Sequence, residues 1–384
     1  MSVDEHIEER EAPLVIGVDL GGTQIRAAVL QGAQIRARAA ALTGHDATPE
    51  RVLPRIYATM QEALTSAGVT LDQITGIGVA APGPLDNREG VLYSPPNLPT
   101  WQAVPLRELL SQYFQLPVFV ENDANAAALG EFFFGAGQGS RDMVYLTVST
   151  GIGGGIIANG QILEGTNGTA GELGHITIDW RGERCSCGSI GCLEALASGT
   201  AIARKANQAI MHGEGADLLN FASLMAEHPT TVPDKKALPD QNFSTQPLNS
   251  GSLANPEAAL PTQEWKVTAQ TVARAAEAGI PIAREIITEA AEALGFGLVN
   301  ILHTFSPEIV ILGGGVMQMG ALIMEPALKV VHEHTMRANM AKTRIVLAQL
   351  GINAGLVGAG ALPAYYREQR EGMAAHQGMG EDKA

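Results

Sequence analysis

The sequence predicts an α/β protein built from two similar halves. Short apolar runs that end at glycines alternate with helix-like segments, which is typical of strands and helices packed in layers. The pattern of strand, glycine turn and strand at residues 15–23 recurs at 144–153, which suggests an internal duplication. A length of 384 residues with 46% hydrophobic content suits about two domains with substantial cores.

The first half opens with three expected strands. Apolar runs cover residues 14–19, 24–30 and 34–40, and Gly21-Gly22 and Gln31-Gly32 separate them. Glycines between short apolar runs favour tight turns, so we expect three antiparallel strands.

A helix, two further strands and a second helix follow. Thr48 is a suitable N-cap for a helix that begins at Pro49 and ends near Gly68, although Pro54 favours a later start. The other expected elements are strands at 74–80 and 117–120, the second leading through Glu121-Asn122-Asp123 into an alanine-rich helix.

The second half adds the repeated turn and a different segment. A long helix is expected over 281–304, then a buried strand over 309–312 and a glycine cluster before another helix. Residues 228–265 hold six prolines and few large apolar side chains, so we expect a surface excursion without catalytic residues. Residues 1–12 and 371–384 are expected to be tails.

One histidine and all three cysteines lie within eighteen positions, as His175, Cys185, Cys187 and Cys192. Three thiolates and an imidazole form a complete tetrahedral Cys₃His set for Zn²⁺, and a closed four-ligand site is structural. The alternative is free or disulfide-bonded cysteines. An odd cysteine count and an acidic start without an apolar leader segment disfavour disulfides.

The charge restricts the partners. A net charge of −15 argues against a general binder of nucleic acids or anionic membranes, although the acidity can also serve solubility alone. We find no apolar run near the roughly 20 residues that span a bilayer. The cytoplasm is the expected compartment, and any phosphate binding must be local.

Glycine turns suggest where phosphate binds. Asp19-Leu20-Gly21-Gly22-Thr23 and Ser149-Thr150-Gly151-Ile152-Gly153 lack side-chain bulk after a strand, so their N–H groups can approach an anion. Neither turn matches a Walker A motif or a dinucleotide fingerprint, and each alone could be an ordinary hairpin. With Gly313-Gly314-Gly315 as a third cluster, the set favours a nucleotide held between two lobes. Asp19 could orient Mg²⁺ or simply end a strand.

Three stretches together resemble a known family. They are residues 19–23, Glu121-Asn122-Asp123, and Glu172-Leu173-Gly174-His175 running into Cys-x-Cys-Gly-x-x-Gly-Cys-x-Glu. The chain is similar to the ROK family of sugar kinases, which includes bacterial glucokinases, over most of residues 14–365.

The resemblance implies an actin/hexokinase-like (ribonuclease H-like) fold of two α/β lobes with a cleft between them. The small lobe would comprise residues 14–121 with about 350–370, and the large lobe 122–349 with the zinc loop at 175–192. Such enzymes transfer the γ-phosphoryl group of ATP to a sugar hydroxyl with Mg²⁺, here the 6-hydroxyl of a hexose such as glucose. Family members are often dimers or tetramers.

The resemblance also implies roles for individual residues. Asp123 matches the general base, although it could equally cap the helix that begins at Ala124. One nitrogen of His175 would bind zinc and leave the other for the sugar, while Cys192 would anchor Glu194. The positions expected to bind sugar are Gly83, Asn97, Asn122, Asp123, Glu172, His175 and Glu194, and those expected to bind nucleotide are Asp19, Gly21, Gly22, Thr23, Ser149, Thr150, Gly151, Gly153 and Gly313 to Gly315.

Four alternatives stay open. ROK repressors carry an N-terminal helix-turn-helix, for which about a dozen residues before the first strand are too few. A kinase for another hexose or an N-acetylhexosamine would share these motifs. Polyphosphate could replace ATP, and a zinc-stabilised binding module without turnover is the fourth reading.

Overall fold

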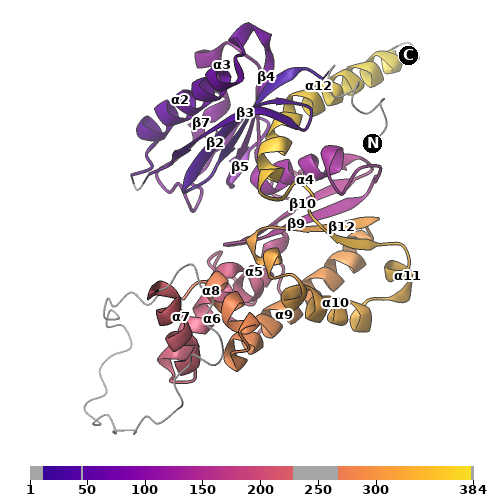
Figure 1. Cartoon of the computed structure of the whole chain (residues 1–384). Helices are drawn as coiled ribbons and strands as arrows, with labels where there is room; N and C mark the ends of the chain where they lie inside the picture. The colour runs from indigo at the N-terminus through magenta and orange to yellow at the C-terminus, as the bar shows by residue number, and fades with distance from the viewer. Residues whose placement is uncertain (1–11, 45, 228–266, 382–384) are drawn as a thin grey trace.

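The computed structural model describes residues 12–44, 46–227 and 267–381 (Figure 1). The expected excursion at 228–265 and residues 1–11 of the expected N-terminal tail lie outside these ranges. Two five-stranded sheets carry the fold, one in each half of the molecule.

The first sheet combines an antiparallel meander with parallel strands. Strands β3, β2 and β1 pair antiparallel, and β1, β4 and β8 pair parallel. The three antiparallel strands joined by tight turns are therefore confirmed. The strands, in sheet order, are β3 (Gln34–Leu42), β2 (Gln24–Gln31), β1 (Leu14–Leu20), β4 (Ile74–Ala81) and β8 (Val118–Asn122).

The second sheet repeats this arrangement, which confirms the duplication. Its first three strands are antiparallel and its last three are parallel, as in the first sheet. The strands, in sheet order, are β11 (Gln161–Ile162), β10 (Ile152–Ala158), β9 (Met143–Val148), β12 (Ile309–Gly313) and β13 (Arg344–Leu347).

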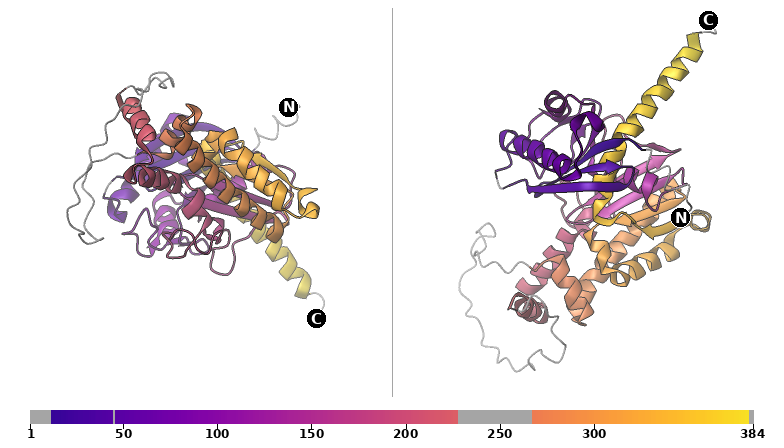
Figure 2. Two further views of the ribbon diagram at one scale, coloured as in Figure 1. Left: turned by 90° about the horizontal axis from the view of Figure 1, so that it is seen from below. Right: turned by 45° about the horizontal axis from the view of Figure 1, so that its top comes forward.

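Two helices lie between the sheets (Figures 1 and 2). Helix α4 (Asp123–Phe134) packs on β9 and β10, and helix α12 (Ala354–Glu381) packs on α4, β1 and β4. Glycines permit the close approach, since a Cβ at Gly78 would lie 1.8 Å from the carbonyl oxygen of Ala359. The last helix of the chain thus completes the half that the first strand begins.

Other helices cover the outer faces of the sheets. Helices α2 and α3 pack on the first sheet, and α9 lies in the main core of the second half with α5, α6, α8 and α10 around it. Their bounds are α2 (Pro49–Ala67), α3 (Leu106–Phe114), α5 (Leu193–Ala197), α6 (Gly199–Met211), α7 (Ala216–Glu227), α8 (Ala269–Glu277), α9 (Pro281–Phe305), α10 (Ala321–His334) and α11 (Arg337–Met340).

Short elements join these layers. A three-stranded sheet lies within the first half, and two of the short 3₁₀ turns contain His175 and Gly315. They are β5 (Leu85–Asp86), β6 (Val91–Leu92), β7 (Val104–Pro105), and 3₁₀ turns at Leu71–Gln73, Leu173–His175, Gly315–Met319 and Gly351–Asn353.

Helices cover both faces of the second sheet, and this explains why its central strands are apolar throughout. Along β9, Val144, Leu146 and Val148 enter the core around α9, whereas Met143 and Tyr145 enter the core around α4 and α12. Side chains alternate between the faces of a strand, so a strand that is covered on both sides reads as a continuous apolar run.

Several details differ from expectation. Helix α2 begins at Pro49 and includes Pro54, so the later start is wrong. Asn122, rather than Asp123, caps helix α4. Helix α9 is long and apolar enough to span a membrane by length and composition, but 67% of its apolar window is buried in the core. Residues 371–381, expected as tail, continue helix α12.

Candidate active site

Two adjacent cavities lie where the two halves meet, and a third lies beside them within the second half. We call them the small, middle and large cavities, with volumes of about 370, 670 and 850 Å³. Ser149 lines all three, and Asp123 lines both the small and the middle cavity. A group bound in the small cavity can therefore meet one bound in the middle cavity at Asp123.

The small cavity gathers all the residues expected to bind sugar. They come from separate loops of both halves, yet they line one space of a size typical for small ligands. The residues are Gly83, Asn97, Asn122, Asp123, Glu172, His175 and Glu194, and Ser149, Thr150, Gly151 and Gly153 line the same cavity.

Topology brings Asp123 and Asp19 to the same edge. Strands β1, β4 and β8 are parallel, so their carboxyl ends meet at one edge of the sheet, where ligands of open α/β sheets bind. Asp19 lies near the end of β1, and Asp123 directly follows β8. Both carboxylates line the middle cavity.

The Asp123 carboxylate opens onto the cleft, and protein atoms surround it on the other sides. Its Oδ1 accepts a hydrogen bond of 2.8 Å from the N–H of Ala124. Burial, and next the charge of Asp19, raise the pKa of Asp123 to about 6, although the Ala124 N–H counteracts this. Such a carboxyl group is ionised at neutral pH and is a stronger base than an ordinary aspartate.

Glu121 plays a different part from its neighbours. It is buried on the other side of the strand end, where its oxygens accept hydrogen bonds from the side chains of Asn87 (2.9 Å), Asn125 (3.0 Å) and Tyr366 and from the Asn122 N–H (2.7 Å). Burial raises the pKa of Glu121, and these donors oppose the shift. Of the expected Glu-Asn-Asp acceptor set, only the last two residues face the cavity.

Glu194 is held by the second glycine turn. Its Oε2 accepts a hydrogen bond of 2.8 Å from the N–H of Ile152, and its Oε1 lies 3.5 Å from the Ser186 hydroxyl. A Cβ at Gly151 would lie 2.4 Å from Oε2. Position 151 therefore requires glycine, because the Glu194 carboxylate occupies the space that a side chain would need.

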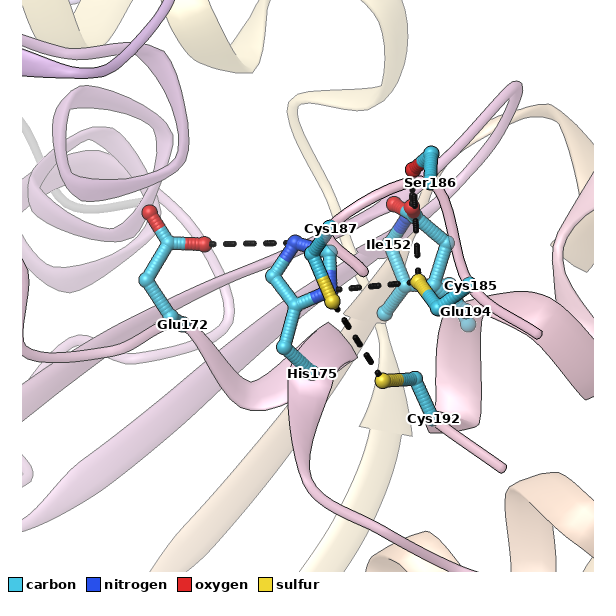
Figure 3. A network of polar contacts seen from close by, with 8 residues as sticks. All are labelled: Ile152, Glu172, His175, Cys185, Ser186, Cys187, Cys192 and Glu194. Atoms are coloured by element: carbon cyan, nitrogen blue, oxygen red, sulfur yellow. Dashed lines mark hydrogen bonds and ion pairs between the residues drawn. The ribbon is translucent and has the colours of Figure 1, made fainter. Parts of the chain in front are cut away.

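His175 connects the metal-ligand cluster to the small cavity (Figure 3). Its Nδ1 lies 3.6 Å from Cys185 Sγ, and its Nε2 lies 3.9 Å from Glu172 Oε2. The two ring nitrogens thus face different partners. One side of the ring is directed at the cysteines and the other at a carboxylate of the cavity.

The cluster itself fits a tetrahedral metal. The ligand atoms of His175, Cys185, Cys187 and Cys192 all lie within 4.8 Å of one another, and the sulfurs of Cys187 and Cys192 are 3.7 Å apart. Zn–S bonds of about 2.3 Å in a tetrahedron place two sulfurs about 3.8 Å apart. Burial, and next the neighbouring thiols, raise the pKa of Cys192 to about 12, so metal binding would have to displace its proton.

The middle cavity has glycine-rich backbone on one side and charged side chains on the other. Gly313, Gly314 and Gly315 line it, together with Asp19 and Arg26. Gly314 has φ +92°, and a Cβ there would lie 2.3 Å from the carbonyl oxygen of Val148. This turn therefore requires glycine and presents bare backbone to the cavity.

The first glycine turn holds three of the residues expected to bind nucleotide. Gly21, Gly22 and Thr23 are not among the residues that line these three cavities. A Cβ at Gly22 would lie 2.4 Å from the Cβ of Asn97, so this glycine allows the Asn97 loop to pack against the hairpin. Trp101 of the same loop is fully buried and donates a 2.8 Å hydrogen bond to the Ala47 carbonyl, so it packs the loop against the body of the first half.

The sequence analysis did not identify most residues of the large cavity, and it did not identify Arg26 in the middle cavity. The large cavity lies between helices α6 and α8 and the 3₁₀ turn at Gly315–Met319, and it offers a guanidinium, amides and hydroxyls. The missed residues include Arg26, Thr200, Asn207, Thr268, Arg274 and Gln318.

Fold and site together define a protein of two similar α/β halves with adjoining cavities at and beside their junction. The matching family model, described as ROK family, covers residues 15–364. The chain belongs to the ROK family, and its fold is the actin/hexokinase-like fold expected from the sequence.

The relatives include both enzymes and regulators. A glucokinase of Halalkalibacterium halodurans is 33% identical over 90% of this chain and 93% of its own length. A xylose repressor of Caldicellulosiruptor bescii is 31% identical over 80% of this chain and 67% of its own. The structure of a ROK family glucokinase from Streptomyces griseus in complex with glucose and AMPPNP has 34% identity and a TM-score of 0.69, and covers 91% of this chain and 98% of its own.

Proposed function

We propose that this protein transfers the γ-phosphoryl group of ATP to the 6-hydroxyl of a hexose, with glucose as the favoured sugar. One observation carries the proposal: Asp123 lines both the small cavity, rich in carboxylates and amides, and the middle cavity, rich in backbone glycine. Glucose and AMPPNP in the complex of the relative from Streptomyces griseus support the same pairing of ligands.

In this mechanism the small cavity holds the sugar. Glu172, Glu194 and Asn97 accept or donate hydrogen bonds to the ring hydroxyls, and Nε2 of His175 adds a further contact. Several fixed polar groups can hold the sugar in one orientation and so place its 6-hydroxyl beside Asp123. Asn122, which caps helix α4, would contribute its amide.

Asp123 accepts the proton of the attacking hydroxyl. The raised pKa of about 6 keeps the carboxylate ionised at neutral pH while making it basic enough to take the proton. General-base catalysis of this kind contributes about 10²- to 10⁴-fold.

Backbone groups and Mg²⁺ would bind the nucleotide. Gly313 to Gly315, Ser149 and Thr150 would receive the nucleotide with their backbone, and the large cavity would receive its base and ribose. Asp19 is suited to hold Mg²⁺ or its waters, and Mg²⁺ would supply neutralisation of the phosphate charge.

The cluster of His175 and three cysteines would hold a structural zinc ion. Zinc bound by Nδ1 of His175 and by Cys192 would orient that imidazole and the adjoining Glu194, because Cys192 is the N-cap of the helix that carries Glu194. The metal thus braces sugar recognition rather than the reaction itself.

A coupled assay with ATP and Mg²⁺ over a panel of hexoses and N-acetylhexosamines tests the proposal. We expect turnover with glucose and none detectable above background for Asp123→Ala. No turnover with any sugar, or full activity of the variant, would refute it. Polyphosphate in place of ATP tests the other donor, and turnover only with another sugar would assign the protein to that substrate.

The second candidate is a sugar-responsive regulator without turnover, which the repressor relative favours. It predicts that glucose binds without phosphate transfer. We further infer a cytoplasmic protein that forms a homodimer or homotetramer, which sedimentation velocity on the full chain would test.

A further inference from the structure

Tyr366 joins the two halves of the molecule through two carboxylates. It belongs to helix α12, which lies between the sheets (Figure 1), and its hydroxyl contacts Oε2 of Glu121 and, at 3.0 Å, Oε1 of Glu164. Glu121 is part of strand β8 in the first sheet, whereas Glu164 follows strand β11 of the second sheet. Because a phenol has one hydrogen to donate, it serves one of the two carboxylates at a time. Tyr366 thus holds segments of both sheets at one point.

Glu121 fixes the strand end that leads to Asn122 and Asp123. Its Oε1 accepts hydrogen bonds from the N–H of Asn122 at 2.7 Å and from the side chain of Asn125 at 3.0 Å. Glu121 is only 1% exposed, so water cannot replace a partner that it loses. The place of this strand end therefore depends on the groups that hold Glu121, and Tyr366 is one of them.

Glu164 opens a loop of the small cavity, residues 164–172, which we call the cavity loop. The carbonyl oxygen of Glu164 accepts a 3.1 Å hydrogen bond from the N–H of Ala170, which closes the loop on itself. A Cβ at Gly168 would lie 3.6 Å from Oδ1 of Asn87, so the loop reaches the first half. The amide of Asn87 in turn donates to Glu121 and, at 3.2 Å, to the Tyr366 oxygen. The loop residues that line the small cavity are Gly168, Ala170, Gly171 and Glu172.

We propose that Tyr366 is a positioning residue for sugar binding, which holds the cavity loop against the strand end that leads to Asn122 and Asp123. The inference rests on the proposed function, which names the ligand of the small cavity. Tyr366 is not among the described residues that line the three cavities, so it acts through Glu121 and Glu164. Holding both walls of the small cavity in place before the sugar arrives lowers the ordering entropy that binding must overcome.

Removal of the Tyr366 hydroxyl from the full chain tests this role. Tyr366→Phe keeps the ring, which stacks on Phe119 with ring centroids 5.8 Å apart, and loses only the hydroxyl. We expect the dissociation constant for glucose, measured by calorimetric titration, to rise about tenfold, the worth of a hydrogen bond to a charged group. The kcat and the KM for ATP should stay within about threefold, because Asp123 and the nucleotide cavities keep their own contacts.

The adjoining residue of the same helix provides a matched control. The Tyr365 hydroxyl accepts a 2.9 Å hydrogen bond from the N–H of Ile162 and a 2.6 Å bond from the side chain of Gln369. Tyr365→Phe therefore also removes a bonded hydroxyl from α12, but not one that contacts Glu121. It should leave glucose affinity within about twofold.

Changes at Glu164 test whether Tyr366 acts through the cavity loop. Glu164→Ala should weaken glucose binding about as much as Tyr366→Phe, and the double variant should bind no more weakly than either, because both changes break one tie. Glu164→Gln should bind glucose at least as tightly as wild type, since its amide can donate to the phenol oxygen while the phenol donates to Glu121. Additive losses in the double variant would overturn the proposed link.

Hydrogen exchange in the sugar-free protein separates this proposal from the proposed function. Tyr366→Phe should speed exchange of the Ala170 N–H, which closes the cavity loop, by about tenfold and leave exchange in strand β12 unchanged. Unchanged exchange at Ala170, or a Tyr365→Phe protein that loses as much glucose affinity as Tyr366→Phe, overturns the positioning role. Wild type that phosphorylates no sugar while Tyr366→Phe still speeds this exchange would refute the kinase proposal and leave the tie in place.

Discussion

The two halves of the molecule share one topology but contribute different chemistry to the cleft. The first half and the helix that follows its last strand supply fixed charges to the middle cavity, through Asp19, Arg26 and Asp123. The second half supplies backbone turns and a metal-ligand loop that carries Glu172 and Glu194 to the small cavity. The two halves thus share one arrangement of strands and helices, and they differ in the residues that their loops bring to the cleft.

The comparison predicts that changes in the first group reduce turnover, whereas changes in the second reduce sugar affinity. The largest effect is expected for Asp123→Asn, which removes the base and should lower kcat by about 10²- to 10⁴-fold while leaving the dissociation constant for glucose within threefold. Steady-state kinetics and glucose titration measure both. Asp72→Asn, an exposed change in the same half, is the control. A variant that loses glucose binding instead would break the division between the halves.

The next largest effect is expected in the metal loop. Cys192→Ser removes a buried ligand, so we expect loss of bound zinc and a glucose affinity lower by about 10- to 100-fold, as for lost support of ligand orientation. Metal analysis and glucose titration check this. Ser189→Ala in the same loop should keep both properties. Zinc-free protein that binds glucose normally would show that the cluster does not support the sugar site.

The pH dependence of kcat/KM tests the charged residues of the first group, Asp19 and Asp123. Burial and Asp19 raise the pKa of Asp123 to about 6, so the base becomes protonated as the pH falls through this value. We expect kcat/KM for the sugar to fall about tenfold per pH unit below 6. Asp19→Asn removes one of the raising charges and should shift this limb to lower pH. An unshifted limb would assign it to another group.

The smallest effect is expected at the second glycine turn. Gly151→Ala places a methyl group on the Glu194 carboxylate and should break its hydrogen bond to the Ile152 N–H. Loss of one such contact is worth about 2- to 10-fold, seen as a raised KM for glucose with kcat nearly unchanged. An equal fall in kcat would show that this turn acts on the reaction itself.

Local sequence signals were sufficient for most of the fold. Glycine turns and apolar runs predicted the strands of the first sheet, and β12 of the second, to within two residues, because strands covered by helices need continuous apolar stretches. Strands β9 and β10 were recognised only as a repeated strand-turn-strand pattern, and β11 and β13 were not predicted. The capping residue of α4 was mistaken, since Asn122 and Asp123 are both good caps and only the backbone conformation distinguishes them.

Site residues could be predicted where they cluster in the sequence, but not where the fold brings residues of distant segments together. The residues of the small cavity came from motifs, whereas Arg274 and Asn207 lie on separate helices that no local pattern relates. Arg26 could have been found, because a hairpin turning at residues 21–23 places position 26 opposite Asp19. At Gly22 the contact with Asn97 accounts for the glycine as well as a phosphate contact would, because both require a position without a Cβ.

Helix α12 has a consequence for biosynthesis. The first sheet buries one of its faces against a helix that begins at residue 354, so this face cannot close until the chain has been synthesised beyond that residue. Strands β1 and β4 must therefore wait for a helix that is more than 270 residues further along the chain. Fragments that end before residue 354 should expose that apolar face and aggregate, and the nascent chain should therefore need chaperone protection until helix α12 has been made.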